Sequence, residues 1–201
     1  IFIKLGQVLS TRPDVLPAVY IDELSHLQDR ITPVPTAEIR AIIQAQLGQS
    51  VDEVFSQFEN DNVATASVAQ VHRATVKSGA WAGREVAVKV LRPDIDDLIK
   101  TDIECMYVAA RYFAQNHIDG KRLKPVEVVA QVERHLRQEL DLQCESANAS
   151  QLRHNMRNST LISVPEVCWD YSAQRVMVME WMTGIPVSHI DTLREMNVDF
   201  K

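Results

Sequence analysis

The chain has 201 residues and a formal net charge of −6, with 46% hydrophobic and 24% charged residues. This composition is that of an ordinary globular protein, and the length allows one domain or one domain with an appendage. The negative net charge argues against a nucleic-acid surface, because such a surface needs clustered Lys and Arg. No run approaches the ~18 consecutive apolar residues that would span a membrane.

The cysteines indicate the redox compartment of the protein, and the first residue indicates whether the chain is a fragment. Cys105, Cys144 and Cys168 are odd in number and show no CxxC spacing. They indicate free, buried thiols in a reducing compartment, and neither a disulfide framework nor a zinc site. The chain begins at Ile1 inside a helical pattern, without an initiator Met or a signal peptide. We therefore interpret it as a fragment of a longer protein.

The N-terminal part of the chain predicts helices only. Amphipathic stretches cover residues 1–10, 20–27, 36–47 and 51–58. Prolines interrupt the pattern between the first three stretches, and Gly48 ends the third. We expect a helical extension over residues 1–60.

The rest of the chain mixes strands with helices. The predicted order is a strand at 67–77, a hairpin turn at 78–83, a strand at 85–91, helices at 94–118 and 125–156, and strands at 164–170 and 175–182. This order matches an antiparallel sheet with helices on one side, which is an α+β arrangement.

One lysine lies in the middle of the predicted strand at 85–91. Three valines occupy one face of this strand, whereas Ala87, Lys89 and Leu91 occupy the other. A Lys among apolar neighbours must reach water or meet an acidic partner, and reaching water is the commoner case. The sequence Val-Ala-Val-Lys, however, has the form of the protein-kinase strand whose Lys holds nucleotide phosphates and pairs with a helical Glu.

The predicted helix at 125–156 contains acidic candidates for that partner. Asp141 and Glu145 are four residues apart and share a helical face, while Glu139 points elsewhere. Acids on a helix commonly form a solvated face. With Lys89 in need of a partner, Glu145 is its natural counter-ion and would orient the ammonium toward phosphate.

A glycine-free loop precedes the lysine strand, where an ordinary kinase has a Gly-rich GxGxxG. It consists of Ala64, Thr65, Ala66, Ser67, Val68 and Ala69. Small residues let backbone N–H groups approach a phosphate, although alanine restricts positive φ and stiffens the loop. An ordinary strand edge made of small residues is the alternative interpretation.

Four blocks of sequence follow one another along the chain. They are Lys4, Gly6 and Gln7 in a KxGQ pattern, the alanine-rich loop 64–67 with Gln70, Val71 and His72, the strand 86–89, and Glu139 and Asp141 in an ExD pattern with residues 145–148 just beyond it. In this order they resemble the UbiB family of atypical kinase-like proteins (aarF-domain proteins) over nearly the whole chain. Thr65 departs from the alanine or serine common in the family, and this change leaves the size of the loop intact.

The resemblance implies a fold and a division of the chain. The fold would be a protein-kinase-like N-lobe, an antiparallel sheet of about five strands with inserted helices at 94–157. A helical extension at 1–60 would carry the KxGQ motif, the N-lobe would cover 61–182, and a truncated C-lobe would begin at 183–201.

The resemblance also implies roles for single residues. Lys89 and Glu145 would form the catalytic ion pair beneath the nucleotide-binding loop 64–69. The backbone of Glu180 and Met182, just after a gatekeeper Met179, would read the adenine. Regulatory and occluding roles would fall to Lys4, Gly6, Gln7, Glu139 and Asp141, the last two near the KxGQ helix and helping to arrange metal or phosphate.

The implied function is that of an ATP-binding, Mg²⁺-dependent kinase-like ATPase supporting ubiquinone biosynthesis. Its partners would be ATP, isoprenoid quinone precursors and ubiquinone-biosynthesis proteins, but no nucleic acid. The family places it at the cytoplasmic face of the bacterial inner membrane, through segments C-terminal to this chain.

Two other functions stay open. One is a genuine protein or small-molecule kinase, and the other is a non-catalytic pseudokinase that acts as a scaffold or lipid-binding module. The catalytic Asp and Asn and the metal-binding Asp of a kinase come after the hinge, so we expect them beyond Lys201. We expect no metal ligand within the chain and no turnover by this fragment alone.

Overall fold

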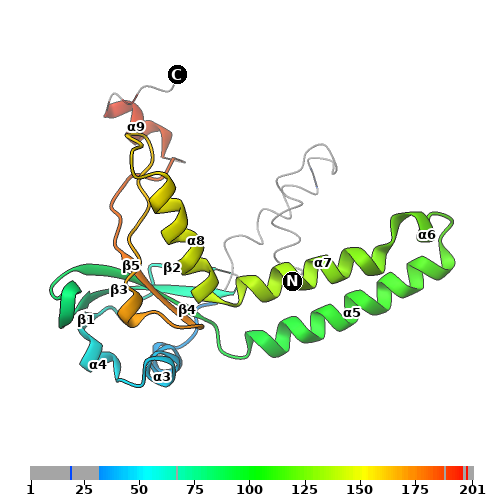
Figure 1. The fold of residues 1–201 in the computed structure, drawn as a ribbon, viewed down its shortest axis with the longest axis horizontal. Helices are drawn as coiled ribbons and strands as arrows, with labels where there is room; N and C mark the ends of the chain where they lie inside the picture. The colour runs from blue at the N-terminus through cyan, green and yellow to red at the C-terminus, as the bar shows by residue number, and fades with distance from the viewer. Residues whose placement is uncertain (1–18, 20–31, 67, 188, 197, 199–201) are drawn as a thin grey trace.

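A five-stranded antiparallel sheet forms the centre of the computed structural model, which describes residues 19, 32–66, 68–187, 189–196 and 198 (Figure 1). The strands run in the order β1-β3-β4-β5, and β2 pairs with β3 outside this path. Their bounds are Phe55–Phe58 (β1), Ala64–Thr65 (β2), Ala69–Val76 (β3), Glu85–Leu91 (β4) and Val176–Glu180 (β5).

Helices lie on both faces of this sheet and beyond it. The helices of the described residues are Thr36–Leu47 (α3), Val51–Val54 (α4), Ile95–Asn116 (α5), Gly120–Leu123 (α6), Pro125–Glu139 (α7), Leu142–Asn155 (α8) and Ile190–Glu195 (α9), with 3-10 turns at Gly79–Trp81 and Trp169–Tyr171. In Figure 1, α3 and α4 lie on one side of the sheet and α8 on the other, while α5 and α7 run side by side away from it. The α+β prediction is confirmed, but its placing of the helices on one side is wrong. No helix in the described part of the chain is long and apolar enough to cross a membrane.

Strand β4 divides the core into two clusters, as its alternation predicts. Val86, Val88 and Val90 are fully buried on one face and pack with residues of α3 and α4. Leu91 is fully buried on the other face, in a cluster with residues of α5, α7 and α8. Lys89 shares the face of Leu91, and its neighbours in the sheet are Val71 of β3 and Met177 of β5.

The helix predicted at 51–58 is wrong in its second half. Helix α4 begins with a capping box between Ser50 and Glu53 and ends at Val54. The chain then continues as β1, in which Phe55 is buried opposite Val76. Pairing with β3 overrides the local helical pattern, because it gives the backbone N–H and C=O groups hydrogen-bond partners and buries the ring of Phe55. The sheet therefore starts at residue 55, before the predicted lobe boundary at 61.

The strand predicted at 164–170 is reduced to a short stretch of pairing beside β5. Val167 forms an isolated bridge with Met179, and the Cys168 N–H donates to the Val178 carbonyl at 2.8 Å. Pro165 cannot donate to a ladder, and a 3-10 turn starts at Trp169. These two features leave too few residues for a full strand.

The three cysteines are free thiols, and only one of them is buried. Cys105 and Cys144 are exposed, so the prediction of buried thiols is right for Cys168 alone. Burial raises the pKa of the Cys168 thiol to about 11.

A buried polar pair joins the sheet to the segment that enters α3. The Gln70 amide accepts from the Val34 N–H at 2.8 Å and contacts His72 Nε2 at 2.9 Å. His72 Nδ1 lies 2.9 Å from the Glu59 carbonyl. The Glu59 carbonyl accepts only from a protonated Nδ1, and the Gln70 amide nitrogen can only donate, so Nε2 is the acceptor and this arrangement fits a neutral His72. Burial lowers the pKa of His72 below its ordinary 6.5.

This lowered pKa predicts a pH-dependent stability. Below about pH 6.5 the unfolded chain binds a proton at His72 that the folded chain does not, so the free energy of unfolding falls as the pH falls toward the folded pKa. A His72→Asn variant removes this proton and should show a flatter dependence than the parent between about pH 6.5 and 5. Urea denaturation at several pH values measures it. The exposed His154→Asn variant is the control, and equal slopes in parent and His72→Asn would contradict the prediction.

Candidate nucleotide site

An ion pair joins the sheet to helix α8. The Lys89 ammonium lies 2.5 Å from Glu145 Oε1 and 2.7 Å from Oε2, so it bridges both oxygens of the carboxylate. The Lys89 side chain is 21% exposed and that of Glu145 is 41% exposed. Partly exposed pairs of this kind contribute little to stability, about 0–1 kcal/mol. The pair instead fixes the position of the Lys89 ammonium, which it holds at the edge of a cavity.

The start of helix α8 brings Glu145 to this position. Leu142 is fully buried in the second core cluster, and its N–H donates to the Gln174 carbonyl at 2.9 Å. Ser146 is buried one turn later and donates from Oγ to the Leu142 carbonyl at 2.7 Å. Glu145 lies in the first turn, where the positive end of the helix dipole favours a carboxylate.

The long helix predicted at 125–156 is two helices, because the chain breaks at Leu140 and Asp141. The Asp141 carboxylate caps α8 and accepts from the N–H groups of Gln143 at 2.9 Å and Cys144 at 3.2 Å. Asp141 is therefore outside the helix, and the prediction that it shares a helical face with Glu145 is wrong. An Asp preceding a helical turn with a Glu is an N-terminal signal that sequence reading could have used.

A cavity of about 710 Å³ opens beside the ion pair. The residues that line it come from the loop after β2, from β4, and from α7 and α8: Ala66, Val68, Lys89, His135, Gln138, Glu139, Cys144, Glu145, Ala147 and Asn148. The size is that of a small-molecule site, for which about 300–1,000 Å³ is typical. Lys89 places a cation at its edge, and the wall from α7 and α8 is largely polar. Sequence reading assigned no role to the other lining residues of these two helices: His135, Gln138, Cys144, Ala147 and Asn148.

The alanine-rich loop forms a tight turn between β2 and β3. Ala64 pairs with Val71, Thr65 pairs with Gln70, and the Ala66 N–H donates to the Ala69 carbonyl at 2.8 Å. Of the six loop residues, Ala66 and Val68 line the cavity, whereas Ala69 is fully buried in the core. Ser67 lies outside the described residues. Part of the predicted loop thus lines the same cavity as Lys89, and its contact with a nucleotide stays a prediction.

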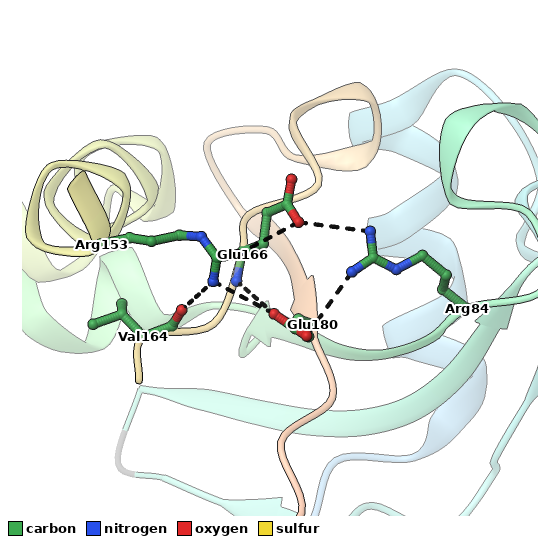
Figure 2. Close-up of polar contacts among 5 residues, drawn as sticks. All are labelled: Arg84, Arg153, Val164, Glu166 and Glu180. Atoms are coloured by element: carbon green, nitrogen blue, oxygen red, sulfur yellow. Dashed lines mark hydrogen bonds and ion pairs between the residues drawn. The ribbon is translucent and has the colours of Figure 1, made fainter. Parts of the chain in front are cut away.

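The predicted adenine-reading residues lie apart from the cavity lining. Met179 is partly buried against the second core cluster, opposite Ala87. The Glu180 N–H donates to the Glu166 carbonyl at 2.8 Å, and the Glu180 carboxylate faces two arginines (Figure 2). Met182 is 44% exposed just beyond the end of β5. Their proposed contact with a base stays a prediction.

The predicted regulatory residues are only partly covered by the structure. Lys4, Gly6 and Gln7 lie outside the described residues. Glu139 lines the cavity at the end of α7, and Asp141 has the capping role given above. Among the described residues no group of three or more His, Cys, Asp or Glu side chains could hold a metal ion.

Comparison with known proteins identifies the family of this chain. Residues 26–201 match the model of the ABC1 atypical kinase-like domain. The chain is 49% identical over 201 residues to a protein of Cellvibrio japonicus (strain Ueda107) named "Probable protein kinase UbiB". The match covers the whole of this chain. It covers only 36% of the relative, so the chain spans about a third of the relative's length.

A solved structure supports the same fold. It is titled "The complex structure of Rv3197-erythromycin from Mycobacterium tuberculosis" and matches with a TM-score of 0.65 at 29% identity. The alignment covers 92% of this chain and 45% of that protein.

The capping geometry predicts what substitution of Asp141 does. Asp141→Ala removes the acceptor for two N–H groups and should lower the free energy of unfolding by about 1 kcal/mol, whereas Asp141→Asn keeps a capping oxygen and should cost far less. Urea denaturation of the three proteins measures the difference. Equal losses in both variants would show that the carboxylate charge, and not the cap, is what matters.

Proposed function

This chain belongs to the ABC1 family of atypical kinase-like domains, the UbiB group among them, and on that premise we propose that it is the nucleotide-clamping lobe of an ATP-binding, kinase-like ATPase. The single observation that carries the proposal is the Lys89–Glu145 pair at the edge of a cavity about 710 Å³ in volume, with Ala66 and Val68 above it.

The residues of the cavity suit a polyphosphate. The Lys89 ammonium is the cation that would contact phosphate oxygens, and Glu145 keeps it pointed across the cavity mouth instead of into bulk water. Ala66 and Val68 line the same cavity, and their side chains leave room beside Lys89 for a phosphate group. Bound ATP would supply the phosphoanhydride that is cleaved. The described residues offer no ligand cluster for Mg²⁺, so the proposal assigns its ligands to other parts of the full-length protein.

The expected result of removing the cation is loss of nucleotide binding. In the full-length protein, Lys89→Ala should weaken binding of a fluorescent ATP analogue in the presence of Mg²⁺ by about tenfold or more, since a hydrogen bond to a charged group is worth about 1.5–3 kcal/mol. Titration followed by fluorescence measures it. Lys100→Ala, an exposed lysine on α5, is the matched control. Unchanged affinity in Lys89→Ala would refute the nucleotide role.

We also propose the pathway that the name of the relative suggests, ubiquinone biosynthesis, with isoprenoid quinone precursors or biosynthetic proteins as partners. In a bacterium whose own copy of the gene is replaced, Lys89→Ala should lower cellular ubiquinone toward the level of the deletion strain, while Lys100→Ala should not. Quinone extraction with chromatographic quantification tests it. Normal ubiquinone levels in the Lys89→Ala strain would show that ubiquinone synthesis does not depend on the proposed nucleotide site, and would refute this assignment.

The name of the Cellvibrio relative, a probable protein kinase, also favours a second candidate, a genuine kinase that phosphorylates a protein or small molecule. Transfer of the γ-phosphoryl group from labelled ATP to a defined acceptor, lost with Lys89→Ala, would favour it over ATP hydrolysis. A third candidate, the pseudokinase scaffold, would keep partner binding in Lys89→Ala. Association with the cytoplasmic face of the inner membrane belongs to the same proposal and rests on the family alone.

A further inference from the structure

Four charged side chains form an ion network at the other end of α8, and none of them touches the cavity (Figure 2). Arg153 of α8 lies 3.6 Å from Glu180 of β5 and 3.8 Å from Glu166. Arg84, which precedes β4, lies 3.6 Å from Glu166 and 3.9 Å from Glu180. The α8 network (Arg84, Arg153, Glu166, Glu180) thus joins a helix to the edge of the sheet with two positive and two negative charges.

Contacts outside the α8 network hold its members in place. Arg153 also donates to the Val164 carbonyl, and the Glu166 N–H donates to Glu180 Oε2 at 3.2 Å. The Arg84 guanidinium lies 3.8 Å from the ring centroid of Trp81, which is buried in the first core cluster. Both carboxylates therefore sit between guanidinium groups whose own positions are restrained.

Helix α8 needs such an anchor, because its apolar packing stops at Ala149. Leu142 and Ser146 are buried and Ala149 packs against the second core cluster, whereas residues 151–155 are all exposed. A helix fixed by core packing normally buries a stripe along its whole length. In the C-terminal half of α8, Arg153 supplies contacts to the sheet edge that buried side chains do not.

We propose that Arg153 is a positioning residue for the nucleotide site, acting on Glu145 through the tilt and roll of α8. The two residues are eight positions apart, about 12 Å along the helix axis. With Arg153 held by Glu166 and Glu180, the helix is anchored at both ends and Glu145 stays directed at Lys89. Without it, the C-terminal half is free to roll, and the carboxylate meets the ammonium for only part of the time. The predicted effect of Arg153 on nucleotide affinity rests on the proposed nucleotide role of the site. Its predicted effect on the position of α8 does not.

The test compares four variants of the full-length protein: Arg153→Gln, Arg153→Lys, Arg157→Gln and Lys89→Ala. Arg157 is the matched control, an exposed arginine one turn further along that is not part of the α8 network. Arg153→Gln should raise the Kd for the fluorescent ATP analogue by about three- to fivefold, as partly exposed ion pairs allow. Arg153→Lys should restore part of the affinity, because it keeps the charge without the planar fork.

Two readouts separate positioning from a general loss of stability. The ratio of Kd between Arg153→Gln and parent should shrink at about 1 M salt, where the screening length falls to about 3 Å. Hydrogen exchange should be faster in residues 142–155 of Arg153→Gln than of Arg157→Gln, with exchange in β4 unchanged in both.

The outcomes distinguish this inference from the proposed function. If Lys89→Ala abolishes binding and Arg153→Gln behaves like Arg157→Gln in both affinity and exchange, the positioning role is overturned and the nucleotide site stands. If Lys89→Ala changes nothing, the nucleotide role fails, and exchange in 142–155 alone decides whether Arg153 positions α8.

Discussion

The candidate site depends on one contact, in which a lysine from the middle of a sheet meets a glutamate from the first turn of a helix. Lys89 occupies a strand face that otherwise packs into the second core cluster, where an ammonium without a partner is disfavoured. Glu145 meets it at the rim of a cavity, so the pair adds little to stability but fixes the position of the cation. The same contact that makes the lysine tolerable in the sheet also aims it at a ligand.

Different interactions hold the two ends of α8, the helix that carries Glu145. A cap at Asp141 and the buried Leu142 define where it starts, so Glu145 is close to a rigid point. The far end depends on partly exposed charges around Arg153. Such charges are worth less than buried apolar surface and are weakened by salt. The helix therefore combines a firmly placed start with an end that small changes in charge can release.

Much of the fold and part of the site follow from local sequence patterns. The alternation in 85–91 predicts the two faces of β4, and the sheet bears this out. Glu145 was identified as the partner of Lys89 from residue type and family pattern, although the two are 56 positions apart. The local pattern is wrong where tertiary contacts compete with it: it predicts helix where β1 forms, and it predicts one long helix where α7 and α8 are separate. Of the α7 residues that line the cavity, Glu139 belongs to the ExD pattern, whereas His135 and Gln138 carry no local signal.

Local sequence patterns are enough to establish the periodicities, the glycine-free loop, the lysine in an apolar strand and the family to which they point, because these properties reside in neighbouring residues. The packed fold is needed to show that Asp141 caps a helix, that Ala66 and Val68 but not Ala69 line the cavity, and that Arg153 reaches Glu166 and Glu180. Each of these outcomes depends on the register between strands and on where a helix starts relative to the sheet. One residue of shift turns a side chain to the opposite face of a strand or by about 100° around a helix, so local pattern alone leaves them undetermined.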